Sequence, residues 1–249
     1  MATASGIIIG DEILSGKVQD TNAGQMIRML HEASVELVRI ATIGDDPTCI
    51  AEEVNLCRRR CDHVITSGGV GPTHDDRTME GIARAFDRPL VRHPELERMV
   101  RFHWADRVNE AALKLAEVPE GAHLLTSEDG LLPLVLLENV FVLPGIPQLF
   151  EAKLQRVRLE LCGVVAVLHS IYLRADESSI AEILTRVDRE FPSVKIGSYP
   201  RIGDPDHRVR VTVESLDPAA AEQALARLLE LLPTAMVVRV ARSEGLSPT

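Results

Sequence analysis

The stretch DHVITSGGVGPTHDDRTMEGIARAF, residues 62–86, decides the fold of this protein. Residues 62–69 form a short β-rich run that ends in glycines, and residues 77–86 have the apolar period of a helix. A strand that passes through a glycine-rich turn into a helix is typical of an α/β protein. We therefore expect a strand–loop–helix unit whose loop, residues 68–76, carries the polar side chains.

The same alternation of strands and helices continues on both sides of this stretch. Strands are predicted at 5–10 and 35–43, with helices at 22–33 and 47–60. The β-α-β-α-β-α order predicts a mostly parallel sheet with helices on both faces, a three-layer α/β/α domain. Downstream we expect one long helix at 94–116, strands at 123–126, 132–138 and 139–145, and a helix at 147–162. These elements complete a first domain of residues 1–165.

Residues 166–249 have a different order of predicted strands and helices, which indicates a smaller α+β domain. Strands are expected at 169–175, 194–200 and 207–215, with helices at 178–191 and 218–232 and a last strand at 235–240. The Asp-Pro turn in GDPDHR, residues 203–208, would join two antiparallel strands.

Composition excludes several classes of protein. The chain has 249 residues, a formal net charge of -10 and a pI of about 5.3, so it is not a general binder of nucleic acids. The start, MATASGIII, does not resemble a signal peptide, and the apolar runs are too short to span a bilayer. We expect a cytoplasmic protein with no membrane partner.

Four cysteines, Cys49, Cys57, Cys61 and Cys162, do not form a C-x-x-C pair. Cys57 and Cys61 are four residues apart on a predicted helix. A metal or redox pair is one interpretation, and small half-buried helix residues in a reducing compartment are the other.

Three acidic loops follow the first three predicted strands: GDEILSG at 10–16, GDD at 44–46 and SGGVGPTHDD at 67–76. Ligands bind beyond the carboxyl ends of parallel strands, so these loops are expected to meet at one edge of the sheet. Their carboxylates are Asp11, Glu12, Asp45, Asp46, Asp75 and Asp76. Crowded acids without matching lysines or arginines need a cation, and Mg²⁺ fits, while His74 extends the choice to Mn²⁺ or Co²⁺.

The glycines of the third loop, Gly68, Gly69 and Gly71, allow backbone N–H groups to approach a ligand closely. Followed by a helix N-terminus, such a loop suits a phosphate or diphosphate. The alternative is that the glycines only form a turn and that Thr73 or Asp76 caps the helix.

Three further positions have two interpretations each. Gly145, in PGIP at 144–147, lies in a pocket wall or only in a helix start. Asn22, in QDTN, caps a helix or contacts a ligand. Tyr199, in GSYP, stacks on a base or packs in the core or a turn.

Four motifs in order, GDEILSGKVQDTN, IGDD, TSGGVGPTHDDRTMEGIARAF and LPGIP, resemble the molybdopterin-binding (MoCF-type) domain. The GPT-x-DD form is similar to the competence/damage-inducible protein A family. It looks closest to the molybdopterin-binding-like domain at the N-terminus of eukaryotic FAD synthases. The later IGSYP resembles the small KH-like subdomain of that group, so the resemblance covers nearly the whole chain.

The resemblance implies a metal-dependent pyrophosphatase that splits FAD, ADP-ribose or a similar diphosphate and releases AMP. Asp45, Asp75 and Asp76 would hold a divalent metal, with Glu12 as a further ligand or a base and His74 polarising water. Asp45 and Asp76 align with functional aspartates of the molybdenum-cofactor enzymes that the resemblance also includes. The glycine loop with Pro72 and Thr73 would hold the diphosphate, and Asn22, Gly145 and Tyr199 are the other substrate-binding candidates.

Two alternatives remain open at this point. One is a molybdopterin-binding protein or adenylyltransferase of molybdenum cofactor biosynthesis, which would use the same pocket. The other is a non-catalytic subunit that binds a nucleotide without turning it over. The resemblance also implies a homo-oligomer, a dimer or trimer, with a small nucleotide or pterin ligand.

Overall fold

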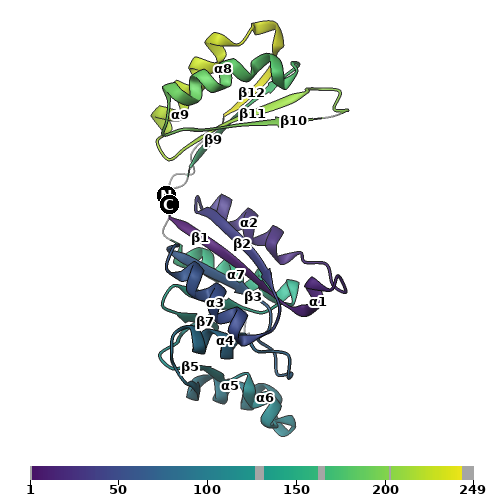
Figure 1. Ribbon diagram of the computed structural model, residues 1–249, viewed down its shortest axis with the longest axis vertical. Coiled ribbons are helices and arrows are strands. Elements are labelled where there is room, and N and C mark those ends of the chain that lie inside the picture. The colour runs from purple at the N-terminus through teal and green to yellow at the C-terminus, as the bar shows by residue number, and fades with distance from the viewer. Residues whose placement is uncertain (1, 127–131, 162–165, 202, 243–249) are drawn as a thin grey trace. The chain divides into compact units, whose positions relative to one another are not determined.

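A computed structural model describes residues 2–126, 132–161, 166–201 and 203–242 (Figure 1). The chain divides into two compact units, residues 1–163 and 164–249, and each is described on its own. Cys162 and the predicted domain boundary at residue 165 lie outside the described residues. In the described ranges, the helices are too short or too polar to cross a bilayer.

The first unit is built on a six-stranded mixed sheet. Its strand order is β2 (Glu36–Ile43), β1 (Thr3–Ile9), β3 (His63–Ser67), β8 (Val140–Leu143), β7 (Leu134–Leu137) and β6 (His123–Leu125). The first four strands are parallel to one another, and β7 runs antiparallel to both of its neighbours, β8 and β6. Only Glu138 and Asn139 join β7 to β8, and Glu138 has a φ of 52°, so this connection is a tight hairpin that cannot link parallel strands.

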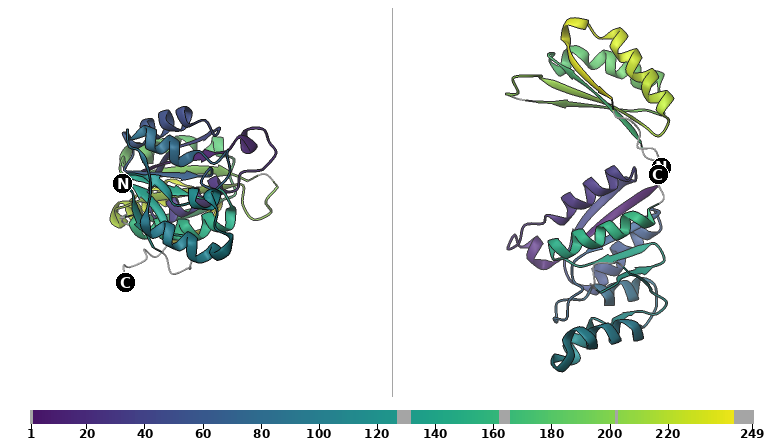
Figure 2. Two further views of the ribbon diagram at one scale, coloured as in Figure 1. Left: turned by 90° about the horizontal axis from the view of Figure 1, so that it is seen from below. Right: turned by 180° about the vertical axis from the view of Figure 1, so that it is seen from behind.

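Helices cover both faces of this sheet, which confirms the predicted three-layer architecture. Figures 1 and 2 show α2 (Asn22–Glu32) and α7 (Pro147–Glu160) on one face, and α3 (Pro47–Arg58) and α4 (Thr78–Ala85) on the other. The sheet has one hydrophobic core on each face, and successive side chains of β1 point alternately into the two cores. Ile7 and Ile9 pack in the core that contains Ile50 and Ile82, and Ile8 packs with Leu30 and Phe150.

The predicted single helix at 94–116 is wrong. The segment forms α5 (Pro94–Trp104), a 3-10 turn at Ala105–Arg107 and a short α6 (Glu110–Lys114). Ala105 has a φ of 45°, which ends α5, and Asn109 restarts the helix by accepting a 2.8 Å hydrogen bond from the Ala112 amide. The flanking strands β4 (Leu90–Arg92) and β5 (Glu117–Pro119) form a small antiparallel pair that periodicity missed, because each has only three residues.

The second unit has the predicted α+β character. Its order is β9 (Val167–Leu173), α8 (Glu177–Glu190), β10 (Lys195–Pro200), β11 (Val209–Ser215), α9 (Pro218–Leu231), a 3-10 turn at Thr234–Met236 and β12 (Val237–Arg242). The sheet is antiparallel, with strand order β10-β11-β9-β12. This is the connectivity of a ferredoxin-like split βαβ unit. Both helices pack on one face of the sheet, over Ile171, Val211 and Val213.

Candidate functional site

The three acidic loops meet at one edge of the first sheet, because β1 lies between β2 and β3. Ile9 is in register with Ile43, and Ile8 with Ser67, so the three strands end at the same level. The Gly10 amide donates a 3.0 Å hydrogen bond to the carbonyl oxygen of Ile43. The parallel register therefore brings together the loops that follow β1, β2 and β3.

Asp45 lies at the centre of this edge. Its carboxylate accepts a 2.8 Å hydrogen bond from the Asp11 amide. Partial burial raises the pKa of Asp45 above its ordinary value, and the nearby negative charges of Asp11, Glu12 and Asp75 raise the pKa further. Acidic groups from all three loops thus act on one carboxyl group.

Asp46, the next residue, has a different function. Its carboxylate accepts hydrogen bonds from the amides of Thr48, at 2.8 Å, and Cys49, at 3.0 Å, and so caps α3. These backbone bonds lower the pKa of Asp46. Of the two adjacent aspartates, only Asp45 is directed to the acidic edge.

Thr73 organises the carboxylates of the third loop. Its amide donates a 2.8 Å hydrogen bond to Asp76 Oδ2, and its hydroxyl lies within hydrogen-bond distance of both Asp75 and Asp76. The hydroxyl bond lowers the pKa of Asp75. Helix α4 has Arg77 at its N-cap position and no side-chain cap. Asp76 and Thr73 therefore shape the loop and do not cap the helix.

His74 and Glu12 are both exposed. The His74 side chain is 97% exposed, and its Nδ1 lies 3.9 Å from Asp75 Oδ1. Glu12 lies on the short helix α1 (Asp11–Leu14), next to Gly10. Their predicted catalytic roles remain predictions, and Pro72 is likewise exposed on its loop.

The fold itself requires glycine at positions 68, 69 and 71, because a side chain at each would collide with neighbouring atoms. Gly68 has a φ of 107°, and a side chain there would collide with the carbonyl oxygen of Ile9. A side chain at Gly69 would meet the Thr78 hydroxyl, which donates a 2.8 Å hydrogen bond to the carbonyl oxygen of Gly68. Gly71 leaves room for the Asp76 carboxylate. The turn therefore requires its glycines, and their contact with a diphosphate remains a prediction.

The buried side chain of Asn22 connects segments of the chain next to the site. It is 5% exposed, and its Nδ2 donates hydrogen bonds to Ser67 Oγ, at 2.9 Å, and to the Gly145 carbonyl oxygen, at 2.8 Å. It thus ties the start of α2 to the end of β3 and to the turn before α7. Gly145 approaches the third loop closely, because a side chain there would lie 3.1 Å from Gly68 Cα.

Two predicted site features lie elsewhere. Tyr199 is on β10 of the second unit, so its contact with this site remains a prediction. The described cysteines are free, Cys61 contacts the Ser5 hydroxyl at 2.9 Å, and burial raises the pKa of Cys57 to about 11. The two thiols are consistent with the packing interpretation.

Lys114 is the functional residue that sequence reasoning missed. Its ammonium group donates hydrogen bonds to the carbonyl oxygens of Thr73 and Asp76, the latter at 2.8 Å. No local motif signals this contact, since α6 lies 38 residues beyond Asp76 along the chain. Arg77, the basic residue nearest in sequence, instead pairs with Glu80 at 3.0 Å.

The donor atoms at this edge suit a hard cation. Carboxylate oxygens from Asp45, Asp75 and Asp76 are the ligand type that Mg²⁺ prefers. Across the described ranges, no three His, Cys, Asp or Glu side chains are preassembled as a metal site. That arrangement is compatible with Mg²⁺, which is commonly held by one or two carboxylates together with phosphate oxygens of the substrate.

Comparison with known proteins identifies relatives of both units. Residues 6–161 match the family described as "Probable molybdopterin binding domain", and residues 166–241 match "FAD synthase, middle domain". A solved structure of the protein CinA from Thermoplasma acidophilum, 28% identical, superposes with a TM-score of 0.59 and covers 64% of this chain and 98% of that one.

Related sequences include proteins of different length. A protein of Archaeoglobus fulgidus is 36% identical over 91% of this chain and 96% of its own length. A probable FAD synthase of Caenorhabditis elegans is 33% identical over 92% of this chain, and the match spans 50% of that protein. A CinA-like protein of Frankia casuarinae is 34% identical over 92% of this chain and 58% of its own length. The chain therefore belongs to the probable molybdopterin-binding domain family, in a form whose second unit is similar to the middle domain of FAD synthase.

Proposed function

We propose that this protein is a divalent-metal-dependent nucleotide pyrophosphatase. Its substrate is FAD, ADP-ribose or a similar nucleotide diphosphate, and AMP is one product. The observation that carries the proposal is the gathering of carboxylates at this edge, where partial burial and then the charges of Asp11, Glu12 and Asp75 raise the pKa of Asp45. In the described part of the chain, Asp45 and Asp76 form no ion pair, and Asp75 lies 3.9 Å from His74. The Thr73 hydroxyl and, less strongly, the charges of His74 and Lys114 lower the pKa of Asp75. A bound cation would offset the negative charge that remains on this edge.

In this proposal Asp45, Asp75 and Asp76 hold Mg²⁺, Mn²⁺ or Co²⁺ together with the substrate's phosphate oxygens. A cation held there would offset the charge of the diphosphate and would lower the pKa of a bound water. Thr73 keeps the carboxylates of Asp75 and Asp76 together through the hydrogen bonds of its amide and hydroxyl. The backbone of Gly68, Gly69 and Gly71, with Pro72, borders the diphosphate.

The chemical step is hydrolysis of the phosphoanhydride bond. A water oxygen bonds to phosphorus, the bridging P–O bond breaks, and the products are AMP and a second phosphate ester. A carboxylate takes the proton that water loses. Glu12, on the loop after β1, is the candidate base, because Asp45, Asp75 and Asp76 would hold the cation.

A second candidate is molybdopterin binding, or adenylyl transfer to molybdopterin. The match of residues 6–161 to a probable molybdopterin binding domain favours it. The same acidic edge would hold the cation and the phosphates of ATP. A protein of this kind retains a pterin and releases no AMP from FAD or ADP-ribose.

The deciding experiment is a chromatographic assay of AMP release from FAD, ADP-ribose or NAD with Mg²⁺, Mn²⁺ or Co²⁺. The Asp76→Asn variant should lose roughly a hundredfold of the activity or more. Asp46→Asn is the matched control, since it makes the same charge change at a helix cap that Asn also serves. No AMP from any pair would end the pyrophosphatase proposal, and bound intact nucleotide would then indicate a non-catalytic binder.

The remaining expectations belong to the same proposal. The resemblance implies a cytoplasmic dimer or trimer with a small nucleotide or pterin ligand. Light scattering of the purified chain measures the oligomeric state, and a monomer at micromolar concentration would contradict the expected assembly.

A further inference from the structure

Both tyrosines of the chain lie in one row of the second sheet. Tyr199 on β10 is in register with Arg210 on β11, and Arg210 with Tyr172 on β9, which is in register with Arg239 on β12. The row crosses all four strands. Ile171 and Val211, which alternate with these residues, face α8 and α9, so the row lies on the opposite face of the sheet.

Each tyrosine is paired with an arginine. The guanidinium carbon of Arg239 lies 3.4 Å from the centre of the Tyr172 ring, and that of Arg210 lies 5.2 Å from the centre of the Tyr199 ring. The His207 ring contacts Tyr172 edge-on, with 4.8 Å between ring centres. Arg239 covers the Tyr172 ring at stacking distance. A ligand at this position would therefore contact the guanidinium plane of Arg239 and not the ring of Tyr172.

Two flat groups are open at the two edges of the sheet. Tyr199 is 49% exposed, and the Arg239 side chain is 51% exposed. Tyr199 lies over Gly197, where a side chain would come within 2.8 Å of the tyrosine ring. The next row of the same face contains only small residues: Gly197, Thr212, Ser170 and Ala241. Thr212 and Ser170 are themselves buried, so a planar ring would reach this face at the exposed Tyr199 and Arg239.

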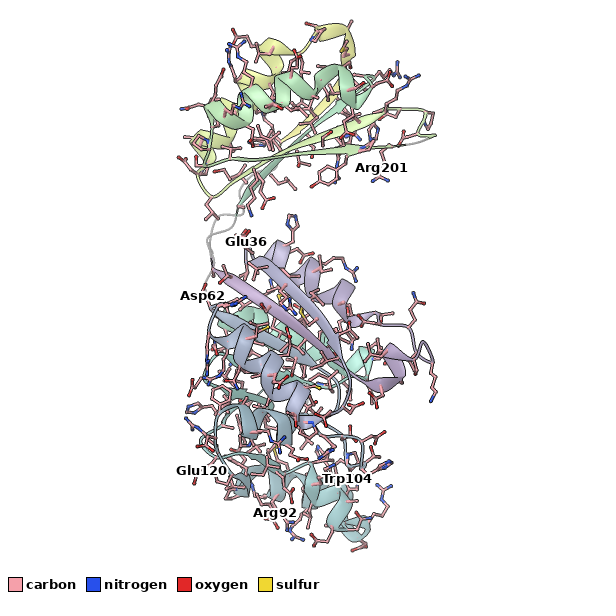
Figure 3. The ribbon with its side chains drawn as sticks, in the orientation of Figure 1. Glu36, Asp62, Arg92, Trp104, Glu120 and Arg201 are labelled. Atoms are coloured by element: carbon pink, nitrogen blue, oxygen red, sulfur yellow. The ribbon has the colours of Figure 1, made fainter. Side chains whose placement is uncertain are left out.

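The row also carries positive charge. Arg210 Nε is enclosed and has no hydrogen-bond partner in the described part of the chain, so this donor is not used by the fold. The positive charge of Arg239 is partly offset by Asp206, whose Oδ2 lies 3.6 Å from Arg239 Nε. Figure 3 shows the labelled Arg201 beyond the end of β10, on the side of the sheet away from α8. The charge complements an anionic group beside a stacked ring.

We infer that this row is a binding site for a nucleotide. The planar ring stacks on Tyr199 or on the guanidinium of Arg239, and the phosphate pairs with Arg210. Aromatic rings and guanidinium planes on a four-stranded sheet stack bases in this manner, and arginine binds phosphate. Single-stranded RNA shares these features, but the net charge of -10 disfavours a long polyanion. The inference does not depend on the proposed pyrophosphatase activity.

Titration of the 249-residue chain with FMN, followed by quenching of flavin fluorescence, tests the site directly. Tyr199→Ala should weaken FMN binding roughly fivefold to a hundredfold, the range for loss of one stacking ring. Arg210→Met should weaken binding of FMN but not of riboflavin, which lacks the phosphate. Arg186→Met is the matched control, because Arg186 lies on α8 and pairs with Glu190. Thermal unfolding checks that each variant is folded.

Asp76→Asn separates the two sites. It should leave FMN binding to the row unchanged, whether or not the chain releases AMP. Absence of quenching, or equal FMN affinity in wild type, Tyr199→Ala and Arg210→Met, would overturn the inference. So would labelled octauridine that binds more than tenfold tighter than FMN and is lost in the same variants, since the row would then be a surface for RNA.

Discussion

The ammonium group of Lys114 lies 2.8 Å from the carbonyl oxygen of Asp76 and also donates to the carbonyl oxygen of Thr73. Helix α6 thereby holds the loop that presents Asp75 and Asp76. The hydrogen bonds of the lysine go to backbone oxygens, and its positive charge adds to the Thr73 hydrogen bond in lowering the pKa of Asp75. The small β4–β5 and α5–α6 region therefore has a direct connection to the candidate site.

Replacing Lys114 by Met should loosen this loop while keeping the aliphatic stem. Loss of two charge-assisted hydrogen bonds at a partly buried position is expected to cost about 1 to 2 kcal/mol in the free energy of unfolding. Urea unfolding measures the cost, and amide hydrogen exchange of residues 70–78 should accelerate. The exposed Lys17→Met is the matched control. Unchanged exchange in the Lys114 variant would show that the loop holds its own geometry.

Asp45→Asn should stabilise the protein near neutral pH. Burial and neighbouring acids raise the folded pKa of Asp45, so ionisation costs stability above that raised pKa and nothing below the ordinary value of 3.8. The gain from Asn should therefore be present at about pH 7.5 and shrink on acidification. Asp46→Asn should have the opposite sign at about pH 7.5, because backbone hydrogen bonds lower the pKa of Asp46.

Urea unfolding of both variants between about pH 7.5 and the lowest pH at which the protein stays folded measures these differences. A loss of stability in Asp45→Asn at neutral pH would contradict the crowding of negative charge on this edge. AMP release from the same samples keeps the stability effect apart from the catalytic effect.

Gly68→Ala should be severely destabilising. The alanine would combine an unfavourable positive φ with a collision against the Ile9 carbonyl oxygen, at an expected cost of about 3 kcal/mol or more. Gly16→Ala separates the two effects, since Gly16 has a φ of 72° and no atom within 4 Å of the added methyl group. It should cost about 1 kcal/mol. Equal losses in thermal or urea unfolding would show that the close approach to β1 is unimportant.

Asn22→Ala should cost about 2 to 3 kcal/mol, because it removes two buried hydrogen bonds and leaves the Gly145 carbonyl oxygen without that donor. Ser67→Ala should cost about 1 kcal/mol. Since the two side chains share one hydrogen bond, the double variant should lose about 0.5 to 1 kcal/mol less than the sum. Strict additivity in urea unfolding would mean that the Asn22–Ser67 bond contributes nothing to stability.

Local patterns predicted much of the fold. The runs around residues 5–10, 35–43 and 62–69 became parallel strands, since short β-rich runs alternate with amphipathic helices. The sequence failed at 94–116, where Asn109 and the positive φ of Ala105 outweigh a continuous helical pattern. Residue type alone did not separate Asp45 from Asp46, because an aspartate serves the acidic edge in one case and a helix cap in the other, and the choice of Asp45 came from the family resemblance.

By itself, the sequence determined the strand–loop–helix order and the gathering of three acidic loops at one edge of a parallel sheet. Both follow from short-range periodicity and from the direction of parallel strands. Only the tertiary structure decided that Lys114 holds the Thr73–Asp76 loop, and that Tyr199 and Tyr172 share a row with Arg210 and Arg239. These contacts depend on packing and strand register between distant segments, which no local pattern of residues encodes.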